Sequence, residues 1–231
     1  MIELAPIESG AHATAGVPPR DCDLCPRLVE LRTECRTQHP DWHNAPVPSF
    51  TAGPDSGGNG PRLLIVGLAP GMKGANRTGR PFTGDYAGDF LYQTLIDYGF
   101  AQGVYQARPD DGLRLFDAAI TNAVRCLPPA NKPIGAEIKA CRRFLRSQVD
   151  ALSALQAILA LGKVAHDSVV AAFGHKLAAF KFGHGAQHAI GPGITLFDSY
   201  HCSRYNTNTR RLTEDMFRAV FNEIRGNLDY P

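Results

Sequence analysis

A short apolar segment that ends in a long glycine-rich loop places the strongest restriction on how this chain can fold. Residues 63–66 are apolar, Gly67 interrupts them, and glycines and prolines recur from there to Asp85. This density of helix and strand breakers predicts that the loop contains neither a helix nor a continued strand. A buried strand therefore leads into a polar loop. In open parallel sheets, ligands bind at such loops, beyond the carboxyl ends of the strands.

Three more apolar segments have the length of buried strands, and they lie at residues 116–124, 157–161 and 194–199. Between and around these strands lie segments whose apolar residues recur at helical spacing. They predict helices over 26–32, 85–98, 135–155, 163–173 and 212–225. The alternation predicts an α/β fold of three layers, α/β/α, around a central, mainly parallel four-stranded sheet. The strand ends should then share one edge of the sheet, at Gly67, Asn122, Gly162 and His201.

The length of 231 residues, with 44% hydrophobic residues, suits one domain that buries a real core. We expect a flexible tail over residues 1–20, where periodicity is lacking, and a single domain over 21–231. A formal charge of +2 neither requires nor excludes a polyanionic partner. No segment approaches the ~20 apolar residues of a membrane span, and the first residues lack the features of a signal peptide. The sequence therefore predicts a cytoplasmic protein without membrane contact.

Six cysteines in a cytoplasmic chain indicate metal binding or redox chemistry more than disulfides. Cys22 and Cys25 are separated by two residues, and Cys126 and Cys141 by fourteen. Two such pairs suit four thiolates around zinc or an iron–sulfur cluster, and the spacing does not decide between them. The alternative is that Cys126 and Cys141 are small buried hydrophobic residues. The remaining cysteines, at 35 and 202, are assigned to no site.

The glycine-rich loop is not a nucleotide-binding loop of the usual kinds. It lacks the Gly-Lys-Ser/Thr ending that grips a nucleotide and its magnesium, and no GxGxxG follows the strand. It does supply backbone N–H groups near a strand end, which can hold an anionic or carbonyl-rich ligand. Phe82 stands in the polar part of this loop, where it is either a stacking platform for a planar ring or a hydrophobic plug.

Polar residues also stand at the ends of two other predicted strands. The carboxamide of Asn122 could read the edge of a lactam, or it could satisfy a turn after the strand. His201 precedes residues 202–211, which contain three arginines and no acid, a pattern that suits phosphate contacts and a wedge in a duplex. His184 and His188 are four apart, but the neighbouring glycines argue against a helical metal pair.

Four motifs together resemble the uracil-DNA glycosylase superfamily: GLAPG at 67–71, GRPFTGD at 79–85, NAVRCLPP at 122–129 and HCSRYNT at 201–207. The four cysteines at 22, 25, 126 and 141 are similar to those of its iron–sulfur branch. Leu68 and Ala69 resemble family 5, the type B enzymes, because the corresponding motif of family 4 carries an acid. The resemblance covers about residues 20 to 225.

The resemblance implies roles for individual residues. Gly67, Leu68, Ala69, Phe82 and Asn122 would bind the base, with Phe82 stacked on it and Asn122 reading its edge. His201 and the N–H groups of the loop would stabilise the negative charge that develops on the leaving base. Arg204, Tyr205 and Asn206 would occupy the gap left by the flipped nucleotide, and Ser203 would also contact the DNA. The four cysteines would hold a structural 4Fe–4S cluster.

The resemblance thus implies a monofunctional DNA glycosylase of base excision repair. It would act as a monomer and hydrolytically excise uracil, and other deaminated bases such as hypoxanthine, from DNA. Which group activates the water is left open, because Asp85, the nearest acid, also suits a helix N-cap. The competing interpretation is an iron–sulfur or zinc DNA-binding sensor without catalysis.

Overall fold

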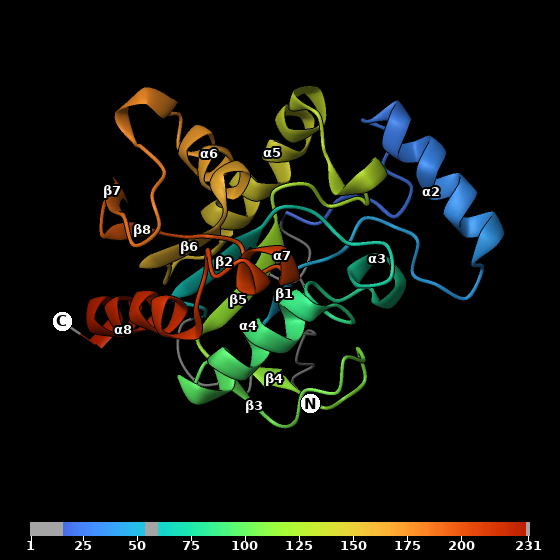
Figure 1. Ribbon diagram of the computed structural model, residues 1–231. Coiled ribbons are helices and arrows are strands. Elements are labelled where there is room, and N and C mark those ends of the chain that lie inside the picture. The colour runs from blue at the N-terminus through green and yellow to red at the C-terminus, as the bar shows by residue number, and fades with distance from the viewer. Residues whose placement is uncertain (1–15, 54–59, 230–231) are drawn as a thin grey trace, which may run out of the picture.

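A six-stranded sheet forms the centre of the computed structural model, which describes residues 16–53 and 60–229 (Figure 1). The strand order is β1-β5-β2-β6-β8-β7. Four neighbouring strands run parallel: β2 (Leu63–Gly67), β5 (Ala118–Asn122), β6 (Ala157–Leu161) and β8 (Ile194–Ser199). These are the four strands that the sequence predicts, so the parallel sheet is confirmed.

Two antiparallel edge strands, which the sequence did not predict, extend this sheet. They are β1 (Phe50–Thr51), paired with β5, and β7 (Gln187–Gly191), paired with β8. β1 is too short to show a hydrophobic period, and β7 is largely accessible to solvent. The strands β2, β5 and β6 are instead buried at every position, and strands covered on both faces read as continuous apolar runs.

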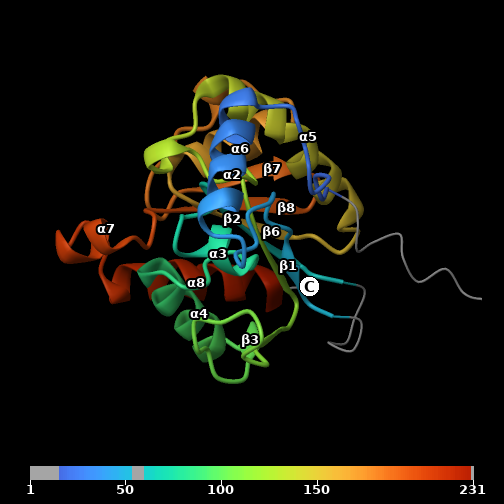
Figure 2. The same ribbon diagram turned by 90° about the vertical axis from the view of Figure 1, so that its right-hand side faces the viewer.

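Helices cover both faces of the sheet, which confirms the three layers (Figures 1 and 2). α4 (Tyr86–Asp97) and α8 (Glu214–Asp229) pack on one face, where Leu91 and Phe217 join the core. α5 (Gly135–Ala151) and α6 (Lys163–Ala172) pack on the other face through Leu145 and Val169. These four helices begin within two residues of their predicted starts.

Several smaller elements complete the described fold. They are α2 (Pro26–Gln38), α7 (Arg204–Asn208), the short 3-10 helices Pro129–Asn131 and Leu177–Ala179, and a two-stranded ribbon of β3 (Ala101–Gln102) and β4 (Arg114–Leu115). α2 is one and a half turns longer than predicted. The ribbon was not predicted, because its strands have two residues each.

The prediction that the glycine-rich loop contains no helix is wrong. One helical turn, α3 (Ala75–Thr78), lies inside it between Gly74 and Gly79. Gly79 has a φ of 76° and ends the turn as a left-handed C-cap, the role for which glycine is preferred. The glycines therefore delimit a short helix instead of excluding one.

Most of the predicted tail, residues 1–15, lies outside the described residues. From Gly16 onward the chain packs against the domain, because the carbonyl oxygen of Gly16 accepts a hydrogen bond from Arg125 Nη2 at 3.2 Å. Among the helices of the described ranges, none is long and apolar enough to cross a membrane.

Candidate active site

The carboxyl ends of the parallel strands surround a cavity of about 470 Å³. This volume lies within the range of about 300–1,000 Å³ that is usual for ligand sites. Loops after all four parallel strands contribute to its wall, as expected for strand ends that share one edge of a sheet. The predicted site residues that line it are Leu68, Ala69, Phe82, Asp85, Asn122, His201, Ser203 and Arg204.

Asn122 is the last residue of β5 and only 3% of its surface is exposed. Its side chain lines the cavity, and its carboxamide has no hydrogen-bond partner among the described residues. A ligand in the cavity that offers both a donor and an acceptor would satisfy it.

Gly67 allows Asn122 and Phe82 to approach each other. It ends β2, beside Asn122 in the parallel register. A Cβ atom at this position would lie 2.5 Å from Asn122 Oδ1 and 2.5 Å from Phe82 Cζ. Gly67 does not line the cavity itself, but the absence of its side chain leaves the space in which the two site residues meet.

Phe82 has a left-handed backbone conformation, with a φ of 53°. Such a conformation is costly for a residue with a side chain, by the order of 1 kcal/mol or more, and it persists only where the surroundings impose it. The ring of Phe82 belongs to the hydrophobic core and also to the cavity wall. It lies 5.9 Å from the ring of His201, measured between centroids, and the two planes are tilted by 25°. Two nearly parallel rings therefore border the cavity.

The imidazole of His201 is neutral at ordinary pH. Burial lowers its pKa to about 4. A neutral imidazole carries one N–H donor and one acceptor, so it can donate a hydrogen bond without bringing a charge into the cavity. A neutral histidine used in this way can polarise a carbonyl or stabilise a developing anion.

The two carboxylate oxygens of Asp85 have different neighbours. Its Oδ1 accepts a hydrogen bond from the N–H of Gly88 at 3.1 Å, which makes it the N-cap of α4. Its Oδ2 lies so close to the loop that a Cβ atom on Gly74 would be 2.5 Å away. Burial raises the pKa of Asp85 above its usual range. The capping role is therefore present, and Asp85 also lines the cavity.

The main chain of Leu68 is fixed by the neighbouring loop, because its carbonyl oxygen accepts from the N–H of Val124 at 3.0 Å. This bond continues the pairing of β2 and β5 beyond the sheet. Leu68 and Ala69 form an apolar part of the cavity wall. A carboxyl group in the cavity must therefore come from another segment, and Asp85 supplies one.

The four predicted DNA-contacting residues divide into two groups. Ser203 is the N-cap of α7 and accepts from the N–H of Asn206, whose Nδ2 donates to the carbonyl oxygen of His201 at 2.8 Å. These two build the turn that carries His201. Arg204 and Tyr205 are exposed, and 72% of the surface of Tyr205 is accessible. Figure 2 shows α7 projecting from the molecule.

Three further residues that the sequence analysis did not single out line the cavity: Tyr86, Asn131 and Lys163. Lys163 follows Gly162, which the sequence places at the end of a strand. Its position at the site could therefore have been predicted from the sequence. Asn131 lies in a turn where Ala130 and Asn131 both have a positive φ, at 52° and 55°, which no apolar periodicity indicates.

Comparison with known proteins agrees with this geometry. The family model of the uracil DNA glycosylase superfamily matches residues 54–225. The chain belongs to this superfamily. The type-5 uracil-DNA glycosylase of Thermus thermophilus is 42% identical over 210 residues, which cover 88% of this chain and 92% of its own length. That of Pyrobaculum aerophilum is 36% identical over 204 residues, covering 87% and 86%. A type-4 enzyme of Sulfurisphaera tokodaii is 29% identical over 164 residues, covering 68% of each. The predicted membership of family 5 is confirmed.

In this superfamily member the four cysteines of the two predicted pairs line one small pocket. Cys22 and Cys25 precede α2, Cys126 follows β5, and Cys141 lies in α5. Cys35 and Cys202 are buried elsewhere.

Two buried arginines lie beside this pocket, and neither pairs with a carboxylate among the described residues. Arg125, 1% exposed, donates only to neutral oxygens, and Arg32 donates to the carbonyl oxygen of Cys22 and lies 3.9 Å from Cys126 Sγ. The Nε atom of each has no hydrogen-bond partner. Unpaired buried charge is strongly unfavourable. A group of thiolates with a net negative charge would compensate it, so these residues fit an anionic iron–sulfur cluster.

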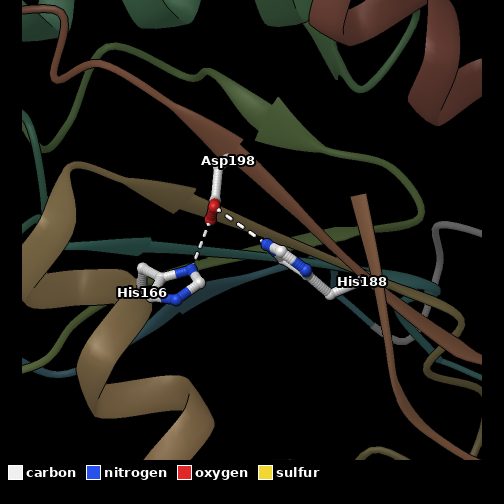
Figure 3. A group of neighbouring side chains, drawn as sticks. All are labelled: His166, His188 and Asp198. Carbon is white, nitrogen blue, oxygen red and sulfur yellow. Dashed lines mark hydrogen bonds and ion pairs between the residues drawn. The ribbon is translucent and has the colours of Figure 1, made fainter. Parts of the chain in front are cut away.

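A second group with metal-ligand chemistry is His166, His188 and Asp198 (Figure 3). His166 Nδ1 lies 2.8 Å from Asp198 Oδ1, and its Nε2 lies 2.9 Å from the carbonyl oxygen of Phe180. Both ring nitrogens face oxygen acceptors, so both donate and neither offers a lone pair to a metal. Burial lowers the pKa of His166, but the bonds to Asp198 and Phe180 outweigh it and raise the pKa. His166 therefore links α6, and through Phe180 the loop after it, to Asp198 on β8.

Proposed function

We propose that the cavity receives a uracil flipped out of DNA and that the protein hydrolyses its N-glycosidic bond, leaving an abasic site. Membership in the superfamily makes the chain a monofunctional DNA glycosylase, and the names of its type-5 relatives support uracil as the base. The observation that carries the assignment is the carboxamide of Asn122, which lines the cavity and has no hydrogen-bond partner among the described residues. A carboxamide matches the donor and acceptor on the edge of a lactam base.

The other cavity residues supply what such a reaction needs. Flipping costs a few kcal/mol, and stacking of the base on Phe82 would recover part of this cost. As the bond breaks, negative charge develops on the base, and neutral His201 would donate a hydrogen bond to it. Preorganised donors of this kind are commonly the largest single contribution to such catalysis.

Water, and not an amine of the protein, would attack the sugar. Lys163 lines the cavity, but its Nζ is held by both oxygens of Asp167 at 2.7 and 2.8 Å. Asp85 is the candidate that orients the water. One of its oxygens caps α4, and the other, beside Gly74, is left for the water because Asp85 lines the cavity. Its raised pKa makes it a stronger base than an ordinary carboxylate.

The cavity also supports excision of larger deaminated bases such as hypoxanthine. Its volume of about 470 Å³ exceeds what a pyrimidine fills, and Leu68 and Ala69 present an apolar wall without an acid. Arg204 and Tyr205, exposed on α7 beside the cavity, would contact the duplex around the flipped nucleotide. Action as a monomer in the cytoplasm stays a prediction.

The four cysteines would hold a 4Fe–4S cluster, with Arg32 and Arg125 providing compensating positive charge. Burial raises the pKa of Cys126 to about 12 and that of Cys141 to about 11, so both thiols are neutral until a metal displaces their protons. Because hydrolysis needs no electron transfer, the role of the cluster would be structural. It would cross-link α2 to the core. Iron and sulfide analysis of the purified protein, with its visible absorption spectrum, tests this assignment.

A glycosylase assay on oligonucleotides tests the function. Release of uracil, with strand breakage only after alkali, is expected, and hypoxanthine release is measured in parallel on single- and double-stranded DNA. His201→Ala and Asn122→Ala should reduce turnover while DNA binding remains. A DNA-binding sensor without catalysis would bind DNA and release no base, and His201→Ala would leave its DNA binding unchanged. Absence of release from both substrates would overturn the proposal.

A further inference from the structure

Phe82 is held in its strained conformation by two tyrosine hydroxyl groups. Tyr92 Oη donates to the carbonyl oxygen of Pro81 at 2.7 Å, and Tyr105 Oη donates to that of Phe82 at 3.1 Å. Tyr105 Oη also accepts from the N–H of Gly84 at 3.2 Å. Because these bonds fix the peptide groups on both sides of Phe82, they set the direction in which its ring points.

An ion pair lies beneath the same segment. Arg80 donates to both oxygens of Asp111 at 2.7 Å, and its Nε donates to Thr83 Oγ1 at 2.7 Å. The guanidinium also lies over the rings of Tyr92 and Tyr105, at 5.3 and 5.7 Å from their centroids. Arg80 is 6% exposed and the side chain of Asp111 is fully buried. The residues that flank Pro81 and Phe82 are therefore tied to one rigid centre.

Tyr105 and Asp111 both come from the loop of the β3–β4 ribbon, residues 103–113. Asp111 is itself fixed, because it accepts from the N–H groups of Gln106 and Leu113 at 3.1 Å each. The rings of Tyr105 and Tyr92 stack with centroids 4.6 Å apart. The ribbon thus places a hydroxyl group and a carboxylate against the back of the cavity wall, opposite the side that faces the ligand.

α4 closes the remaining side. A Cβ atom on Gly88 would lie 1.7 Å from the carbonyl oxygen of Phe82 and 2.5 Å from Tyr105 Oη. The first turn of α4 therefore packs directly on the bond between Tyr105 and Phe82. The Phe82 carbonyl is therefore held between Tyr105 and the first turn of α4.

We propose that the β3–β4 ribbon is a positioning element of the active site and that Tyr105 is its central positioning residue. Its hydroxyl holds the left-handed Phe82 peptide so that the ring presents its face to the base. This inference rests on the proposed role of Phe82 as the stacking platform. It assigns a role to a loop that makes no contact with the cavity, and Tyr105 acts only through Phe82.

Tyr105→Phe tests the inference, because it removes the two hydrogen bonds and keeps the stacked ring. We expect single-turnover excision of uracil to fall roughly tenfold, the size expected for lost hydrogen bonds. Tyr98→Phe is the matched control: Tyr98 is also half-buried, and its hydroxyl lies within hydrogen-bond distance of Arg218 O and Asn222 Oδ1 on α8, away from the cavity. The control should lower the melting temperature by a similar amount and leave excision unchanged.

A double-mutant cycle with Phe82→Ala separates positioning from a general loss of stability. If Tyr105 acts through the Phe82 ring, Tyr105→Phe should reduce the rate less than twofold in the Phe82→Ala background. A full tenfold effect in both backgrounds would overturn the inference and leave the proposed function intact. A wild-type rate in Phe82→Ala would overturn both the platform and the inference. A wild-type protein that releases no base would instead overturn the proposed function itself.

Discussion

The carboxyl group of Asp85 shows how one residue can serve the fold and the site at once. Oδ1 caps α4 through Gly88, and Oδ2 lies beside Gly74, where any side chain would displace it. A cap needs only an oxygen acceptor, whereas orienting and deprotonating water needs a negative charge. These two requirements are separable by substitution.

Comparison of Asp85→Asn with Asp85→Ala separates them. Asparagine retains the acceptor and caps well, so only Asp85→Ala should lose stability, by about 1 kcal/mol. If Asp85 activates the water, both variants should lose excision by a similar factor, on the order of 100-fold or more. The measurements are chemical denaturation and single-turnover excision. Activity retained in Asp85→Asn would leave Asp85 with the capping role alone.

The low pKa of His201 predicts an unusual pH dependence. A free histidine titrates near pH 6.5, but His201 stays neutral until the pH falls to about 4. Excision should therefore show no inflection near pH 6.5 that depends on His201. An inflection at that pH in the wild type that is absent from His201→Gln would contradict this assignment.

The same residue affects stability with a definite sign. Between pH 6.5 and about 4 the unfolded chain binds a proton at position 201 that the folded chain does not, so acid favours unfolding. The stability advantage of His201→Gln over the wild type should therefore grow as the pH falls through this window. The measurement is the difference in unfolding free energy between His201→Gln and the wild type, taken at pH 8 and again at pH 4.5. Groups that titrate alike in both proteins cancel in this difference.

Among the longer helices, α2 buries only three residues against the rest of the molecule. Its buried residues are Leu28, Arg32 and Cys35, and the Arg27–Glu137 ion pair at 2.7 Å links it to α5. The cysteine pocket lies between α2 and the sheet. Much of the docking of α2 would therefore depend on the metal centre proposed there.

Removal of iron by a chelator should loosen α2 before the rest of the molecule. Amide protons of residues 26–38 should lose protection from hydrogen exchange, while those of β2 and β6 keep theirs. Cys25→Ser, which removes one thiol of the pocket, should reproduce the effect. A uniform loss of protection across the sheet would contradict the local role.

The elements differ in how far the sequence could predict them, for physical reasons. Strands buried on both faces, such as β2 and β6, are apolar at every position and were predicted. The β3–β4 ribbon has strands of two residues, too short for any period, so the positions of Tyr105 and Asp111 beneath Phe82 could not be predicted. Asn122 and His201 were found because each stands at the end of a predicted strand.

At the scale of the whole molecule, the parallel sheet brings together residues from distant parts of the chain. The ends of β2, β5, β6 and β8 surround the cavity, and α7 projects beside it (Figure 2). A flipped base leaves a gap in a duplex but none in a single strand. Tyr205, the exposed aromatic residue of α7, is the side chain suited to fill that gap.

Tyr205→Ala should therefore affect the two forms of DNA differently. Excision from double-stranded DNA should fall about tenfold, because the stacking of an aromatic side chain in the gap is worth about 1–3 kcal/mol. Excision from single-stranded DNA should change less than twofold. Leu177→Ala, an exposed apolar residue on the loop after α6, is the control and should alter neither rate. An equal loss on both substrates would make Tyr205 a general DNA contact, because a wedge has no gap to fill in a single strand.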